Sequence, residues 1–109
     1  MDDAMREQLP LTLRVRSVVR AIFPPEQCGI VEQALIEDCG PVQVHSPDFD
    51  ADPIERIWLA ALKLSKGDIG KFEGAVLLAR TDWRDLLMSA DFGFDLSAHL
   101  RWAEQVLEG

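Results

Sequence analysis

Prolines and glycines divide this chain into segments that each suit one helix. The main breaks are the pair Pro24–Pro25, the pair Gly40–Pro41, and Gly67. Proline disrupts a helix interior, and glycine readily adopts the left-handed conformation that ends a helix. Between these breaks, apolar residues return every three or four positions, the period of an amphipathic helix. The 109 residues therefore predict an all-α fold, a single compact domain of five or six short helices over 1–109, with residues 1–9 frayed or disordered.

The first two predicted helices cover residues 11–23 and 25–38. In residues 11–16 apolar and polar side chains also alternate, as they do in a short strand, but the longer apolar stripe at helical spacing favours a helix. In the second helix, Pro25 suits the first turn, and Glu32 and Glu37 are predicted to face solvent. Its predicted buried stripe contains Ile30, Val31, Ala34 and Leu35. The connection over 42–53 is predicted to be irregular, and the sequence leaves residues 42–45 open between helix, strand and loop.

Capping residues mark the starts of the next two helices. Asp52 is the candidate N-cap of a helix that runs to Lys66, where Gly67 can supply a left-handed turn. Asp68 can then cap a fourth helix directly. The predicted buried positions of this fourth helix are Ile69, Phe72, Ala75, Val76 and Ala79, and its Gly70 and Gly74 share one face, which favours close approach by a neighbouring helix.

The stretch TDWRDLLMSADFGFD, residues 81–95, has the pattern of another helix start. Asp82 is the candidate N-cap and Asp85 an acidic residue of the first turn, while Trp83 begins an apolar stripe. A last helix over 96–108 is predicted to bury Leu96, Leu100, Ala103 and Leu107. The predicted common core contains Trp58, Leu62, Phe72, Val76, Trp83 and Leu86.

Two motifs in the C-terminal half, ERIWLAALKLSKGD and DWRDLLMSADF, resemble motifs of a known protein family. Residues 55–102 resemble a small bacterial protein family of unknown function. The resemblance implies an all-helical fold and a bacterial origin, and it supplies no activity. At Asp91 the family pattern has glycine, and aspartate tolerates the left-handed conformation better than most residues. The matching positions are Glu55, Arg56, Gly67, Asp68, Asp82, Trp83, Arg84, Asp85 and Phe92.

The net charge of −8 is concentrated in one stretch of the sequence. Residues 24–55 contain eight acidic side chains and neither lysine nor arginine, whereas the rest of the chain is balanced. An acidic surface repels the phosphate backbone of nucleic acids, which argues against a nucleic-acid partner. The same charge favours a partner protein with a basic segment.

The sequence matches motifs of metal-binding and catalytic sites only in part. The run DFDAD, residues 48–52, resembles the start of a calcium-binding loop, but Pro53 and Leu59 stand where such a loop needs Gly and Glu. His45 and His99 are predicted to lie on the surface, and no serine or cysteine is marked as a nucleophile beside them. Cys28 and Cys39 are predicted to be free, buried thiols in a reducing compartment. We therefore expect no catalytic residues, no cofactor and no metal.

The sequence favours a small soluble cytoplasmic protein that acts through protein contacts, as a non-enzymatic interaction or regulatory module without a membrane partner. One alternative is a helix-turn-helix-like nucleic-acid binder, since a short connection at 66–68 joins two helices. A second alternative is a small enzyme or weak metal-binding protein. The oligomeric state is left open. The candidate partner-binding residues are Glu32, Glu37, Asp48, Asp50 and Arg84.

Overall fold

The computed structural model describes residues 9–41, 43–44 and 51–109, and the side chains of 51–53 lie outside the description. The described residues contain five helices and no strand. The helices are α2 (Leu13–Ile22), α3 (Pro25–Asp38), α4 (Ala51–Ser65), α5 (Ile69–Ser89) and α6 (Ala98–Glu108). The predicted all-α fold is confirmed, and residues 11–16 are not a strand.

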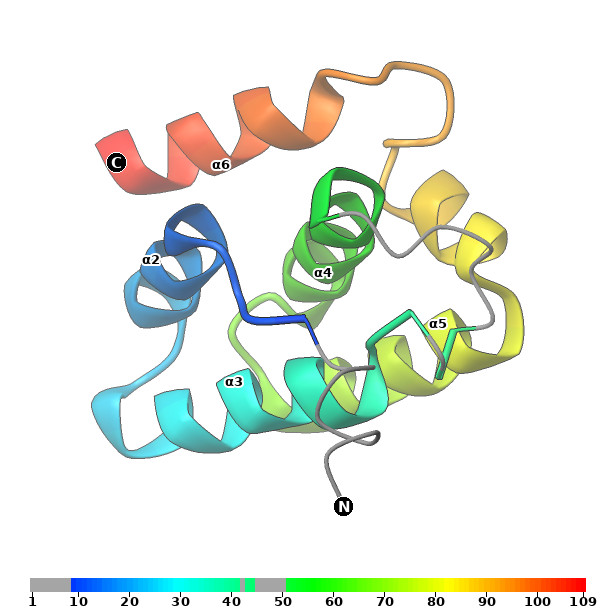
Figure 1. Cartoon of the computed structure of the whole chain (residues 1–109). Coiled ribbons are helices and arrows are strands. Elements are labelled where there is room, and N and C mark those ends of the chain that lie inside the picture. Colours follow the sequence, from blue (N-terminus) through cyan, green and yellow to red (C-terminus); the bar gives the residue numbers. More distant parts are fainter. Residues whose placement is uncertain (1–8, 42, 45–50) are drawn as a thin grey trace.

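Helix α4 is the centre of the molecule, with the other four helices arranged around it (Figure 1). Every side chain from Ile57 to Leu62 is almost completely buried. The Cα radius of gyration is 12.8 Å, close to the roughly 13 Å that a single globular domain of this length would have. Helix α4 is therefore the core element onto which both halves of the chain pack.

Trp58 anchors α3 to this central helix. Its indole ring is fully buried, and its Nε1–H donates to the carbonyl oxygens of Leu35 at 3.2 Å and Cys39 at 3.0 Å. These carbonyls lie at the end of α3, where a helix has no further backbone donors of its own. The side chain thus contributes both apolar burial and the hydrogen bonds that complete α3.

The predicted helix starts are largely confirmed. Asp68 caps α5, its Oδ2 accepting from the Lys71 amide at 2.9 Å. Asp82 has a non-helical backbone and accepts from the amides of Arg84 and Asp85, so the two predicted helices over 69–89 are one element with a kink. Helix α4 begins at Ala51, so Asp52 belongs to its first turn rather than preceding it.

Several predictions about buried faces are wrong. Ile30, Leu96 and Leu107 were expected in the core, but they are 63%, 77% and 47% exposed. Trp83 packs against the core while staying only partly buried. His99, expected on the surface, is buried against the ring of Phe92. Helical period identifies an apolar stripe, but the orientation of neighbouring helices decides how much of the stripe is covered.

The two glycines of α5 do not mark a close helix contact. Both Gly70 and Gly74 are exposed. A Cβ at Gly74 would meet no atom within 4 Å, and one at Gly70 would meet only the Asp68 side chain. Gly67 does permit a close approach between elements, since a Cβ there would lie 2.6 Å from the carbonyl oxygen of Ile22 at the end of α2.

Candidate functional site

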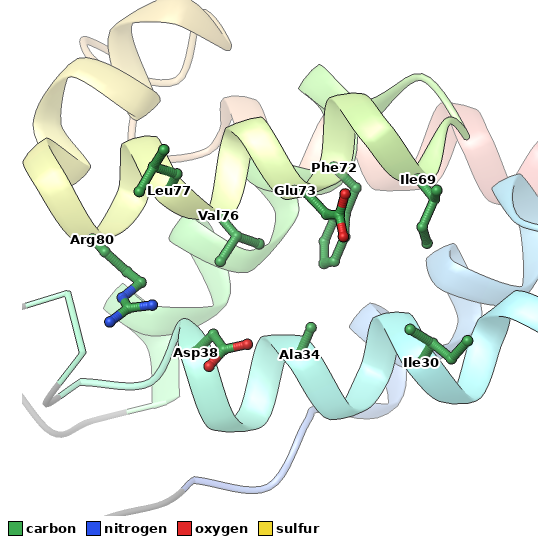
Figure 2. A pocket seen from close by; sticks show the side chains of 9 residues that line it. All are labelled: Ile30, Ala34, Asp38, Ile69, Phe72, Glu73, Val76, Leu77 and Arg80. Atoms are coloured by element: carbon green, nitrogen blue, oxygen red, sulfur yellow. The ribbon is translucent and has the colours of Figure 1, made fainter.

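A groove separates α3 from α5 and has a volume of about 340 Å³. Figure 2 shows Ile69, Phe72 and Val76 pointing from α5 toward α3. Phe72 and Val76 are buried, whereas Ile30 on α3 and Leu77 on α5 are 63% and 65% exposed. The groove therefore presents apolar side chains from both helices to solvent. Its lining residues are Ile30, Ala34, Asp38, Ile69, Phe72, Glu73, Val76, Leu77 and Arg80.

Charged residues border the apolar part of the groove. Asp38, Glu73 and Arg80 line it, and none of the ion pairs between described residues involves any of the three. On α3, Glu26 and Glu37 stand four residues before and seven residues after Ile30, spacings that put them on the same helix face. Helix α3 contains no lysine or arginine. The surroundings of the groove are therefore predominantly acidic.

Glu32 is not the solvent-facing residue that was predicted. Its side chain is 18% exposed and lies between two arginines of α2, with Arg16 Nε at 3.9 Å and Arg20 Nε at 3.7 Å. Charges at these separations attract one another and hold α3 against α2. Because α2 already balances this carboxylate, Glu32 contributes little negative charge toward a partner.

The other predicted partner-binding residues have different surroundings. Glu37 is exposed as predicted and accepts a hydrogen bond from the Gln33 side chain. Arg84 is exposed, and its guanidinium lies 5.2 Å from the centre of the Trp83 ring, within cation–π range. Asp48 and Asp50 lie outside the described residues. Of the described members of the predicted set, Glu37 is the one on the Ile30 face of α3.

A buried carboxylate that sequence reasoning missed joins α2 to α4. Glu55 is 4% exposed, and its Oε1 accepts from Arg14 Nη1 at 2.8 Å while Oε2 accepts from the Thr12 hydroxyl. Thr12 also caps α2, accepting from the Val15 amide. These residues line a second hollow, of about 490 Å³. Since Glu55 is already matched by a cation and a hydroxyl, we interpret this cluster as a structural link between the two helices.

The cysteines and histidines show no nucleophilic arrangement within the described chain. Burial raises the pKa of the Cys39 thiol to about 12, with the nearby Asp38 carboxylate adding to the rise, so it stays protonated at neutral pH. Cys28 is partly buried, and its Sγ lies 3.5–3.7 Å from three backbone carbonyl oxygens. His45 lies outside the described residues. Among the described residues no three His, Cys, Asp or Glu side chains are grouped closely enough to hold a metal ion.

The helix-turn-helix alternative concerns α4, α5 and the turn between them. The exposed charges of α5 are Lys71, Arg80 and Arg84 against Glu73, Asp82 and Asp85. A DNA-reading helix typically carries a basic stripe, and α5 is balanced. The exposed charges of α5 therefore sum to zero rather than to the net positive charge typical of such a helix.

Comparison with protein-family models, with curated proteins and with solved structures finds no match to this chain. The resemblance to a bacterial family of unknown function therefore gains no support from them. Within the described part of the chain, no helix has both the length and the hydropathy needed to cross a bilayer.

Proposed function

We propose that this protein is a non-enzymatic interaction module that binds another protein through the α3–α5 groove. The observation that carries the proposal is the pair of exposed apolar residues, Ile30 on α3 and Leu77 on α5, at the edge of a groove whose buried lining includes Phe72 and Val76. Grooves of this kind, apolar with a few charged residues at the edge, are a common means of protein recognition. The free thiols Cys28 and Cys39 support a cytoplasmic location as part of the proposal.

The test compares a groove variant with a matched surface variant. Leu77→Asp puts a charge into the groove, whereas Leu13→Asp puts the same charge on α2, where Leu13 is 81% exposed. Both residues are exposed, so both variants should fold and melt like the parent protein. Each tagged variant is expressed in the source organism, and copurifying proteins are quantified by mass spectrometry.

We expect at least one partner that the parent protein and Leu13→Asp retain and that Leu77→Asp loses. Recovering the same proteins with all three would show that the groove is not the binding surface. Recovering none would argue against an interaction module.

A further inference from the structure

We infer that the occupant of the α3–α5 groove is an amphipathic helix of another protein, with an apolar stripe flanked by lysine or arginine. The inference rests on the proposed function and specifies the partner's chemistry. It draws on the length and volume of the groove and on the charges around it.

The dimensions of the groove suit one face of a short helix. Its lining runs from Ile30 to Asp38 on α3 and from Ile69 to Arg80 on α5, which is about 12 Å and about 16 Å at 1.5 Å per residue. A helix of two to three turns has this length and a diameter of about 10 Å, so its own volume is on the order of 1,000 Å³. All the free space in the groove, including the part open to solvent, is about 740 Å³. Only one stripe of side chains can enter it, and the opposite face of the bound helix stays in solvent.

The charges around the groove specify the flanks of that helix. Glu26 and Glu37 share the Ile30 face of α3, and Asp38 and Glu73 line the groove itself. Lysine or arginine beside the apolar stripe of the partner would meet these carboxylates. Arg80 is the single cation among the lining residues, so an acidic residue at one end of the partner helix would set its direction.

A second copy of this chain fits less well. In a two-fold dimer the same patch contacts itself, so α3 of one copy, with its acidic residues and no basic ones, would lie against an equally acidic surface. Each chain also carries a net charge of −8. Repulsion between the two copies therefore favours a basic partner over self-association.

The experiment uses three labelled synthetic peptides and measures binding to the full chain by fluorescence anisotropy. The first is an amphipathic helix with leucines at positions i, i+3, i+4 and i+7 and lysines on both flanks. The second replaces the lysines with glutamates. The third keeps the composition of the first and scrambles its order. We expect the first peptide to bind at least about tenfold more tightly than either of the others, and Leu77→Asp to abolish that binding.

A matched pair of charge reversals tests the acidic flank. Glu37→Lys/Glu73→Lys and Glu104→Lys/Glu108→Lys change the net charge equally, but the second pair lies on exposed positions of α6. The first pair should weaken binding of the lysine peptide by about tenfold or more, and the second by less than about threefold. The association rate should fall as salt is raised.

Five outcomes would overturn the inference. Equal binding of the glutamate peptide would remove the charge complementarity, and equal binding of the scrambled peptide would indicate general attraction to an acidic protein. Equal effects of the two charge-reversal pairs would place recognition elsewhere. A dimer detected by light scattering and dissociated by Leu77→Asp would identify the occupant as a second copy. If a native partner depends on Leu77 but the lysine peptide does not bind, the proposed function stands and this inference fails.

Discussion

Glu32 and Glu37 lie five residues apart on α3 and have opposite surroundings. Glu32 sits between Arg16 and Arg20, while Glu37 is exposed beside Gln33. Both are glutamates within one acidic segment, and the sequence pattern treats them alike. The difference arises from α2, whose arginines reach the edge of α3. A charge cluster in the sequence therefore contains both an internal ion-pair partner and an exposed surface charge.

We expect Glu32→Lys to destabilise the protein by about 1–2 kcal/mol, because it removes two attractions and places three cations together. Glu37→Lys should change the free energy of unfolding by less than about 0.5 kcal/mol, because the residue is exposed. Urea denaturation of both variants measures the difference. Equal stabilities would show that the Arg16–Glu32–Arg20 cluster contributes nothing to the fold.

Cys39 makes stability depend on pH in the alkaline range. Its pKa is raised from 9.0 to about 12 in the folded protein, mainly because burial disfavours the thiolate. Below pH 9 both states hold the proton and the contribution to stability is fully present. As pH rises from 9 toward 12, the unfolded state loses its proton first, so stability falls.

A Cys39→Ala variant should lose less stability between pH 8 and pH 10.5 than the parent protein, although its stability at pH 8 is lower because of the missing side chain. Thermal melts over this range measure the slope. In the parent protein, Cys39 should also resist alkylation at pH 8 until denaturant is added, because its thiol is buried. Identical alkaline slopes for the two proteins would contradict the burial of a protonated thiol.

At the scale of the element, the turns depend on neighbouring helices as well as on their own residues. The carbonyls that follow α5 accept from two side chains of α4: Lys63 donates to Ala90 at 2.8 Å, and Arg56 donates to Phe92. Lys63 also lies 5.0 Å from the centre of the Phe92 ring. A cation near a helix C-terminus is favourable, and here it stabilises a neighbouring helix rather than its own. Asp91, with φ of 64°, completes this turn in the left-handed conformation.

We expect glycine-to-alanine substitutions to have opposite effects on stability at Gly67, in the turn between α4 and α5, and at Gly74, within α5. Gly67 has φ of 77°, and an added Cβ would meet the Ile22 carbonyl oxygen at 2.6 Å, so Gly67→Ala should cost about 2–3 kcal/mol. Gly74 lies in an exposed part of α5 with open space around it, so Gly74→Ala should stabilise by up to about 1 kcal/mol. Differential scanning calorimetry would show the melting temperature moving in opposite directions. A rise in both would mean that the contact between the turn and α2 does not constrain Gly67, and a fall in both would mean that Gly74 does not lie in open space.

At the scale of the whole molecule, the net charge of −8 opposes the compact state. Salt screens this repulsion, since the Debye length falls from about 30 Å at 0.01 M to about 8 Å at 0.15 M. The melting temperature should therefore rise over this range of sodium chloride. The rise should be smaller in Glu104→Lys/Glu108→Lys, whose net charge is less negative. A melting temperature that falls with salt would mean that attractive ion pairs, such as those around Glu32, outweigh the repulsion.

The sequence by itself determined the local structure of this protein. Asp68 caps α5 and Asp82 interrupts its helical backbone, both through bonds to amides within a few residues, and the pair Pro24–Pro25 separates α2 from α3. Such features depend on near neighbours in the chain, so composition and spacing are enough to predict them. The concentration of acidic residues in 24–55 is likewise a property of the amino-acid order alone.

Only the tertiary structure decided which side chains are covered and which stay available. Val31 is buried while Ile30, next to it in the predicted stripe, is 63% exposed, because α2, α5 and the Trp58 side chain of α4 reach only part of the apolar face of α3. The partners of Glu55 lie more than forty positions away in the chain. The candidate groove arises from the same cause, since it exists only where α3 and α5 lie side by side without closing over their apolar side chains. Helix packing depends on contacts between residues far apart in the sequence, and no local pattern contains them.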